Sequence, residues 1–418
     1  MKKILLTAFV MLVSLTVLFA QGSKETSADT SGRTVITWWA FPTFGDNGAT
    51  EKALIEAFEK ANPDVKVNLE TIDFTSGPQK LTAAIEGGAA PDVLFDAPGR
   101  IIEYGTNGKL VALDKLFTAD YLADIGGLAN ACTDGTHYYM YPLSSAPFWM
   151  SINREMWEKA GAWQYVNTEG DRLWTTENWA KAMEALGKAG YIGCNVYCGG
   201  QGGDQGTRAL VNNLYSSSIY SDGKWTANTE GNKKALELLK KLYDKGAIDF
   251  GRGIAAADEL QLYQQEMIAS TLCWGTSNAK NYKSDSYTQF SVPFPSEDGV
   301  PELEYLANGF CVFDNGNAAK ADAAIRFIQF ICDDPEWGPK AVVASAAFPA
   351  RASFGNLYGD DPEYALLSSW TQYYGPYYNT RPKFAQMRTQ WWNMLQYVST
   401  GDKTVAKAVA DFDAEANK

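Results

Sequence analysis

Histidine is nearly absent from this chain of 418 residues, because His137 is the only one. Zinc sites and general bases often use imidazole, so a single histidine leaves little room for either. The chain also contains no Gly-x-Ser-x-Gly, no His-Glu-x-x-His and no phosphate loop ending in Gly-Lys-Ser/Thr. We therefore expect no metal site and no cofactor. Carboxylate chemistry stays open, because the chain carries 49 acidic residues.

Cysteine is also sparse, and none lies near Gln21, where a bacterial lipoprotein would need one. We therefore expect no lipid anchor by that route. Only Cys194 and Cys198 are close in sequence, and their spacing fits a tight disulfide or half of a metal site. The simpler interpretation is that most of the cysteines are small buried apolar residues. The six are Cys132, Cys194, Cys198, Cys273, Cys311 and Cys332.

Positive charge is in deficit, since 36 Lys and Arg face 49 Asp and Glu, for a formal net charge of -13. Nucleic acids and anionic membranes attract surfaces rich in Lys and Arg, so neither is an expected partner. A neutral ligand is compatible with this charge. The sequence therefore favours a small uncharged partner over a polyanion.

The first residues have the pattern of a secretory signal. Lys2 and Lys3 precede an apolar run from residue 4 to residue 20, too short for an ordinary membrane span. We expect residues 1–20 to be a signal peptide and residues 21–33, rich in Ser, Thr and Gly, to be a disordered tether. The mature protein would then be periplasmic or extracellular.

Aromatic residues are abundant, with 13 Trp, 22 Tyr and 20 Phe. Many lie beside Gly, Pro or Asn, where loops begin, as in residues 38–42, 148–149, 274–275 and 373–378. A flat apolar ring with a polar rim suits a ligand that is itself half apolar and half polar, and a sugar ring is such a ligand. Most of the aromatics are nevertheless expected to belong to the core.

Hydrophobic periodicity predicts a mixed α/β fold. Strands expected at 34–39, 65–69 and 91–96 are separated by helices near 54–61 and 81–85, which indicates parallel pairing with helical crossovers. Residues 138–153 lack a helical pattern and are expected to be extended and to cross between domains. About 400 mature residues exceed what one hydrophobic core usually supports, so two domains are expected.

Ligands of open α/β sheets bind beyond the carboxyl ends of the strands. This rule selects the loops after the expected strands, including the loop after a late strand that ends at Trp274. The candidates from this rule are Trp39, Phe41, Phe44, Asp46, Gln79, Asp96, Arg100 and Trp274.

Several short motifs, taken in order, resemble the extracellular solute-binding proteins of bacterial ABC importers, in particular the sugar-binding group that includes maltose-binding protein. The resemblance covers nearly the whole mature chain. Its motifs are Ile36-Thr37-Trp38-Trp39, Phe58 to Val67, Gly87 to Asp96, Gly108 to Asp114, Tyr141-Pro142-Leu143, Ile152 to Gly161, Glu266 to Ser270, Asn308-Gly309-Phe310 and Phe348 to Arg351.

The resemblance implies a two-lobe periplasmic-binding-protein fold, each lobe a sheet flanked by helices, with a ligand cleft between the lobes. We place lobe one at 34–143 plus 300–350 and lobe two at 144–299 plus 351–418. It also implies a monomer that carries a carbohydrate, mono- or oligosaccharide, to the membrane subunits of an ABC permease. Trp274 and Trp391 match positions where such proteins place stacking aromatics. The candidates added here are Trp38, Trp149, Asn308, Phe310, Arg351 and Trp391.

Alternatives remain at this point. Arg351 could instead form an ion pair between the lobes. The protein could be a secreted glycoside hydrolase, which also lines its site with aromatics around an acidic pair. It could also bind a non-sugar solute such as a glycerol phosphodiester or a peptide.

Overall fold

The computed structural model describes residues 32–44, 48–73, 76–200, 204–359 and 361–418. The predicted signal peptide, most of the predicted tether and the candidate Asp46 lie outside these ranges. Within the ranges, no helix combines the length and apolar character needed to span a membrane.

A six-stranded sheet begins with the strands predicted from the sequence. β1 (Thr34–Ala40) pairs in parallel with both β2 (Val65–Thr71) and β3 (Val93–Asp96), which confirms the expected parallel order. The connecting helices are α2 (Ala49–Ala61) and α3 (Gly77–Glu86), and α4 (Pro98–Thr106) follows β3. The carboxyl ends of these three strands therefore meet at one edge of the sheet.

Later segments complete this sheet in antiparallel orientation. β4 (Tyr141–Pro147), β10 (Tyr305–Val312) and β11 (Phe348–Pro349) give the strand order β11-β4-β10-β3-β1-β2. Helix α12 (Ala318–Asp333) packs against the sheet, and the ring of its Phe327 meets the buried Trp38 ring edge-on at 5.3 Å. The aromatic side chain of Trp38 is thus a structural part of the core.

A second sheet of three strands has the order β8-β5-β9, formed by β5 (Trp149–Asn153), β8 (Ser270–Trp274) and β9 (Gln289–Val292), all antiparallel. Thr175 caps the helix that starts at Thr176 by accepting from the Asn178 backbone N–H. The other elements in this half are α6 (Arg154–Lys159), η3 (Trp163–Tyr165), α7 (Thr176–Lys188), α8 (Gln205–Leu214), β6 (Tyr220–Ser221), β7 (Lys224–Trp225), α9 (Glu230–Asp244), α10 (Ala256–Gln264), α11 (Thr276–Asn281), α14 (Pro362–Ser369), η5 (Trp370–Tyr373), α15 (Phe384–Thr400) and α16 (Val405–Ala416).

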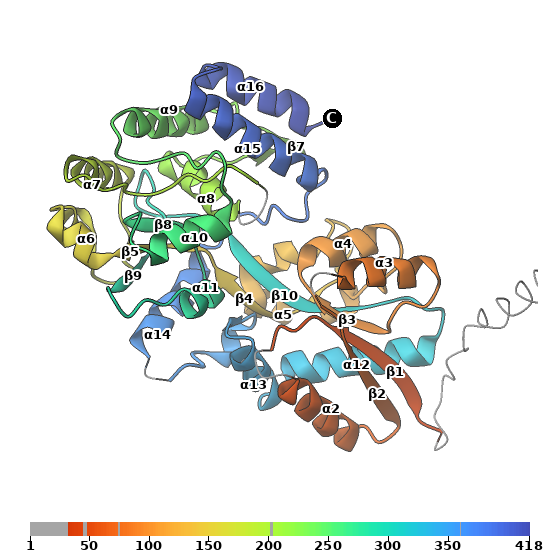
Figure 1. Ribbon diagram of the computed structural model, residues 1–418. Coiled ribbons are helices and arrows are strands. Elements are labelled where there is room, and N and C mark those ends of the chain that lie inside the picture. The colour runs from red at the N-terminus through yellow and green to blue at the C-terminus, as the bar shows by residue number, and fades with distance from the viewer. Residues whose placement is uncertain (1–31, 45–47, 74–75, 201–203, 360) are drawn as a thin grey trace, which may run out of the picture.

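Buried apolar side chains form two separate cores, one around each sheet. We call the part around the six-stranded sheet lobe one and the part around the three-stranded sheet lobe two; Figure 1 shows them side by side, with β4 and β10 running toward their junction. The remaining elements of lobe one are η1 (Asp114–Leu116), α5 (Ala119–Ile125), η2 (Gly126–Ala131), α13 (Trp337–Ala344) and, at its edge, η4 (Ala352–Phe354).

The chain crosses the junction at residues 147–149 and 303–305, and a third time between η4 of lobe one and α14 of lobe two. Residues 373–375 run beside the second crossing, and hydrogen bonds join these segments. The Phe148 backbone N–H donates to the Glu304 carbonyl at 2.7 Å, and the Leu303 N–H donates to the Tyr373 carbonyl at 2.7 Å. Each lobe is therefore assembled from segments that are distant in sequence. The expected extended crossing at 138–153 is confirmed as strands β4 and β5.

Candidate functional site between the lobes

The carboxyl ends of β1 and β3 bring aromatic and charged candidates together in lobe one. The Phe44 ring stacks on the Phe95 ring with centroids 5.4 Å apart, and the Arg100 guanidinium lies over the Phe41 ring at 4.9 Å from its centroid. A methyl group at Gly77 would lie 3.1 Å from the Phe41 ring, so α3 begins in close contact with this cluster. The sequence rule for strand ends thus gathered residues that do contact one another.

An ion pair sits at the centre of this cluster. The Arg100 Nε donates to Asp96 Oδ2 at 2.6 Å and its Nη2 donates to Oδ1 at 2.5 Å, while the Ala97 N–H donates to the same Oδ1 at 2.7 Å. Burial raises the pKa of the Asp96 carboxyl, and the Arg100 charge opposes that rise. Because both oxygens accept hydrogen bonds, the carboxylate is held in a fixed orientation.

Trp39 lies on the opposite side of β1 from Trp38 and is 8% exposed. The Lys80 ammonium group, on α3, lies 5.1 Å from the centroid of its ring and also pairs with Glu70. Gln79, the preceding residue, is exposed at the surface of the same helix. This edge of lobe one therefore offers one aromatic ring and two cations, and each cation has a carboxylate partner.

Two tryptophans predicted from lobe two are buried in its core. Trp149 and Trp274 face each other in the β5–β8 register, and they are 0% and 2% exposed. The Trp274 ring meets Tyr263 edge-on at 5.5 Å, and the Trp149 ring meets Trp370 in the same way at 6.2 Å. The strand-end rule assumes parallel strands; β5, β8 and β9 are antiparallel, so neighbouring strands end on opposite edges and the rule does not select a common edge.

Helix α15 buries Trp391, and the next residue is more open. The Trp391 indole donates to Thr207 Oγ1 at 3.0 Å, and its ring packs against Phe412. Trp392 is half-buried, and a methyl group at Gly200 would lie 3.3 Å from its ring. One residue rotates a side chain by roughly 100° around a helix, so Trp391 and Trp392 lie on different faces of α15.

Arg388, Trp392 and Gln396 share the face of α15 that the sequence analysis missed. Arg388 Nη2 donates to Asp204 Oδ1 at 2.9 Å, and Gln396 Nε2 donates to the Cys198 carbonyl at 2.7 Å. The i, i+4 spacing of an arginine, a tryptophan and a glutamine was the signal that could have found this face.

The segment that leads into α15 also contacts lobe one, near the Asp96–Arg100 ion pair. A methyl group at Gly99, next to Arg100, would lie 3.6 Å from the Asn379 carbonyl oxygen. The Asp96–Arg100 pair and the segment that leads into α15 are therefore neighbours across the junction. Figure 1 shows the same proximity of α4 to the chain entering α15.

Two predicted residues, Phe310 and Asn308, lie on β10. Phe310 is fully buried between Phe95 and Trp38, so it belongs with Trp38 to the lobe-one core. Asn308 is half-buried, and its strand shifts register against β4 between Asn308 and Gly309. Nine of the predicted residues are buried, namely Trp38, Trp39, Phe41, Phe44, Asp96, Trp149, Trp274, Phe310 and Trp391.

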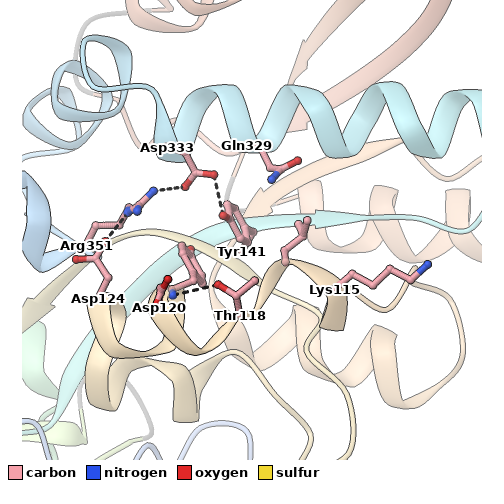
Figure 2. Close-up of a pocket in the computed structure, with 10 residues that line it drawn as sticks. Lys115, Thr118, Asp120, Asp124, Tyr141, Gln329, Asp333 and Arg351 are labelled. Carbon is pink, nitrogen blue, oxygen red and sulfur yellow. Dashed lines mark hydrogen bonds and ion pairs between the residues drawn. The ribbon is translucent and has the colours of Figure 1, made fainter.

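Arg351 lines a cavity of about 450 Å³ in lobe one, away from the cluster at the strand ends. Its Nε donates to Asp124 at 2.7 Å and its Nη1 to Asp333 at 2.8 Å, and Asp333 also accepts from the Tyr141 hydroxyl. Figure 2 shows these side chains converging from α5, β4 and α12. Arg351 is therefore an ion-pair residue of lobe one, because both of its partners lie in that lobe.

The described parts of the chain contain no group of three or more His, Cys, Asp and Glu side chains arranged to hold a metal. All six cysteines are buried and free, so the disulfide alternative for Cys194 and Cys198 is not formed in this structure. Burial raises the pKa of the Cys198 thiol to about 12, which makes it a poor nucleophile at neutral pH.

Comparison with known proteins places this arrangement among binding proteins. The model of the family described as bacterial extracellular solute-binding protein matches residues 42–334. The arabinooligosaccharide-binding protein of Bacillus subtilis is 25% identical over 254 residues, which cover 58% of this chain and 55% of that protein. The chain thus spans about half the length of that relative.

Two solved structures show the same fold over nearly the whole chain. The cyclic alpha-maltosyl-1,6-maltose binding protein of Arthrobacter globiformis is 17% identical, with a TM-score of 0.73 over 92% of this chain and 98% of its own. UgpB of Mycobacterium tuberculosis, in complex with glycerophosphocholine, is 17% identical, with a TM-score of 0.69 over 92% of this chain and 97% of its own. At these identities the likeness establishes the two-lobe fold alone.

Proposed function

Since the chain belongs to the bacterial extracellular solute-binding protein family, we propose that it captures a carbohydrate between its lobes and delivers it to the membrane subunits of an ABC importer. The proposed site joins the strand-end cluster of lobe one to the Arg388–Trp392 face of α15. A hinge closure of the lobes around the ligand would bring the two surfaces together. We further propose that the protein binds its ligand without altering it.

The observation that carries the proposal is that the three cations named at these surfaces each have an anionic partner. Arg100 pairs with Asp96, Lys80 with Glu70 and Arg388 with Asp204. A phosphate or carboxylate ligand would need unpaired cations or helix N-termini. Charge-neutral pairs beside aromatic rings instead suit a ligand that both donates and accepts hydrogen bonds and has apolar faces, which describes a neutral sugar.

The proposed site would bind a sugar through aromatic rings and through charged groups. The half-buried Trp392 ring and the exposed part of Trp39 would pack against C–H faces of the sugar. The Asp96 carboxylate and the Arg100 guanidinium would bind hydroxyl groups, and charge-assisted hydrogen bonds of this kind are stronger than neutral ones. Phe41 would support Arg100 from beneath, and Phe44 stacks on Phe95 beside it. Their rings are buried, so we assign them no direct contact.

The relatives support a sugar but leave its identity open. The Bacillus subtilis protein is described as binding arabinooligosaccharides and the Arthrobacter globiformis protein as binding a cyclic maltosyl-maltose. UgpB, with glycerophosphocholine, has the same fold with a different ligand class. The fold therefore does not decide between these ligands, and the neutral pairing of the cations is our reason to favour the sugar.

A melting experiment tests the proposal. The purified protein would be heated with arabino-oligosaccharides, malto-oligosaccharides and glycerophosphocholine in parallel. A bound ligand at a hundredfold excess over its Kd stabilises the protein by about 2.7 kcal/mol. We expect a rise with at least one neutral oligosaccharide and none with glycerophosphocholine. A rise with glycerophosphocholine alone would exclude the sugar, and cleavage of an added oligosaccharide would show an enzyme.

A further inference from the structure

The tyrosine-rich segment Tyr373–Tyr378 takes no part in the proposed ligand site, yet it lies at the junction of the lobes. It follows η5 in lobe two and runs beside the crossing at residues 303–305. The Leu303 N–H donates to the Tyr373 carbonyl at 2.7 Å, and the Gly375 N–H donates to the Leu303 carbonyl at 3.0 Å. We call residues 373–378 the interlobe strap.

The crossing beside the strap is held in lobe two up to Glu304. The Asn213 amide nitrogen donates to the Glu302 carbonyl at 2.8 Å, and the Glu302 N–H donates to the Asn213 amide oxygen at 2.7 Å. The fully buried Arg208, also on α8, donates to both Glu304 carboxylate oxygens at 2.9 and 2.7 Å. These contacts fix residues 302–304 to helix α8.

The next residue belongs to the other lobe. Tyr305 begins β10, and its ring is 2% exposed within the lobe-one core. This crossing is therefore bonded to lobe two up to Glu304 and packed in lobe one from Tyr305 onward. A rotation of the lobes must be absorbed by the few dihedral angles near such a boundary.

The strap contacts both lobes beside this boundary. The Tyr373 hydroxyl donates to Asp171 Oδ2 at 2.6 Å, which is a contact within lobe two. The Tyr374 hydroxyl donates to Ser145 Oγ of β4 at 2.9 Å, and its ring stacks on Tyr305 with centroids 4.1 Å apart and planes 13° apart. The Tyr374 side chain packs against both hydrophobic cores.

The last two tyrosines repeat this alternation. Tyr377 is buried in the lobe-one core, with its ring centroid 5.0 Å from that of Tyr305. Tyr378 belongs to the lobe-two core, and its hydroxyl lies 3.0 Å from Ser218 Oγ. Within six residues the strap thus contacts lobe two, lobe one, lobe one and lobe two again through its tyrosines.

We propose that the interlobe strap sets the angle between the lobes and that Tyr374 is a positioning residue for ligand capture. Tyr374 holds the strap to the lobe-one sheet through Ser145 and through Tyr305, while Tyr373 and Tyr378 hold the strap to lobe two. Loss of the Tyr374 hydroxyl weakens one side of this attachment only. The consequence for affinity rests on the proposed function, whereas the effect on the angle between the lobes does not.

The angle can be measured without any ligand. Ala83→Cys on α3 and Lys224→Cys on β7 place one exposed cysteine on each lobe, and spin labels attached there report an interlobe distance distribution. The six native cysteines are buried, which favours labelling of the introduced pair. We expect Tyr374→Phe to displace or broaden the distribution, whereas Tyr287→Phe, which removes a hydroxyl contact to the Tyr263 carbonyl within lobe two and away from the strap, leaves it like the parent's.

Ser145→Ala removes the acceptor of the Tyr374 hydrogen bond and should give the same distance distribution as Tyr374→Phe. Either variant can therefore test the proposal if the other folds poorly. Parent-like distributions for both Tyr374→Phe and Ser145→Ala would overturn the proposal. With a sugar identified in the melting experiment, Tyr374→Phe should change Kd by about threefold or more. If no sugar in the melting experiment bound, the proposed function would be contradicted. The interlobe distance measurement would still test the strap, because it needs no ligand.

Discussion

At the scale of single residues, the Asp96–Arg100 pair combines burial of the carboxylate with a position at the carboxyl end of β3. The Asp96 side chain is 3% exposed and that of Arg100 is 37% exposed. Removing one member of such a pair leaves the other charge without compensation in a partly dry environment. The same pair would be the main source of charge-assisted hydrogen bonds to a sugar hydroxyl.

Arg100→Met should therefore lower both stability and affinity. We expect a loss of about 1.5–3 kcal/mol in the free energy of unfolding, because a charged hydrogen-bond partner of Asp96 is lost. Urea unfolding measures the first effect and sugar titration the second. Arg326→Met is the matched control; its partners Asp64 and Asp322 are exposed, so it should cost less than about 1 kcal/mol.

Alanine variants of Trp274 and Trp392 distinguish a tryptophan that stabilises the core from one proposed to contact the ligand. Trp274 is buried against Tyr263, so Trp274→Ala should cost the unliganded protein about 3–5 kcal/mol. Trp392 is half-buried, so Trp392→Ala should lower the unliganded melting temperature much less and should remove most of the rise produced by a sugar. Equal losses of unliganded stability in both variants would show that Trp392 is also core.

At the scale of elements, α10 is fixed to β8 by one buried carboxyl. Glu259 accepts from Thr271 Oγ1 at 2.5 Å and from the Leu272 N–H at 2.8 Å. Burial raises its pKa to about 8. The unfolded state releases this proton near the ordinary glutamate pKa of 4.5, whereas the folded state keeps it to a higher pH. The free energy of unfolding must therefore fall as pH rises between those two values.

Glu259→Gln should flatten this pH dependence. The amide keeps an acceptor for the Leu272 N–H and cannot ionise, so the difference in urea midpoint between pH 5 and pH 8 should shrink relative to the parent. Glu237→Gln, at an exposed position on α9, is the control and should leave the difference unchanged. An undiminished difference in Glu259→Gln would show that other groups cause the loss of stability above pH 5.

The elements also show what local sequence can and cannot predict. The alternation in Val65–Leu69 and the helix stop at Asn62-Pro63 predict β2 and the end of α2, because both signals are local. The antiparallel pairing of β5 with β8 and β9 joins residues more than a hundred positions apart, and no local pattern specifies it. The strand-end rule therefore applies to Asp96 and Arg100, which follow a strand in a parallel pair, and does not apply to Trp274, whose strand is antiparallel to its neighbour.

At the scale of the whole molecule, two cores joined by three crossings make a body suited to hinge motion. The hydrogen bonds between the crossings lie near Leu303 and Glu304, where anchorage changes lobes. If the lobes close on a sugar, the radius of gyration from X-ray scattering should fall when the sugar is added. An unchanged radius at saturating sugar would show that binding does not alter the angle between the lobes.

The central claim is tested most directly by a crystal structure with the oligosaccharide that raises the melting temperature most. We predict that the sugar lies between the carboxyl ends of β1 and β3 and the Arg388–Trp392 face of α15, with hydroxyl groups bonded to Asp96 or Arg100. A sugar seated in the Arg351 cavity of lobe one, or one that leaves both Arg100 and Trp392 without contact, would contradict the account.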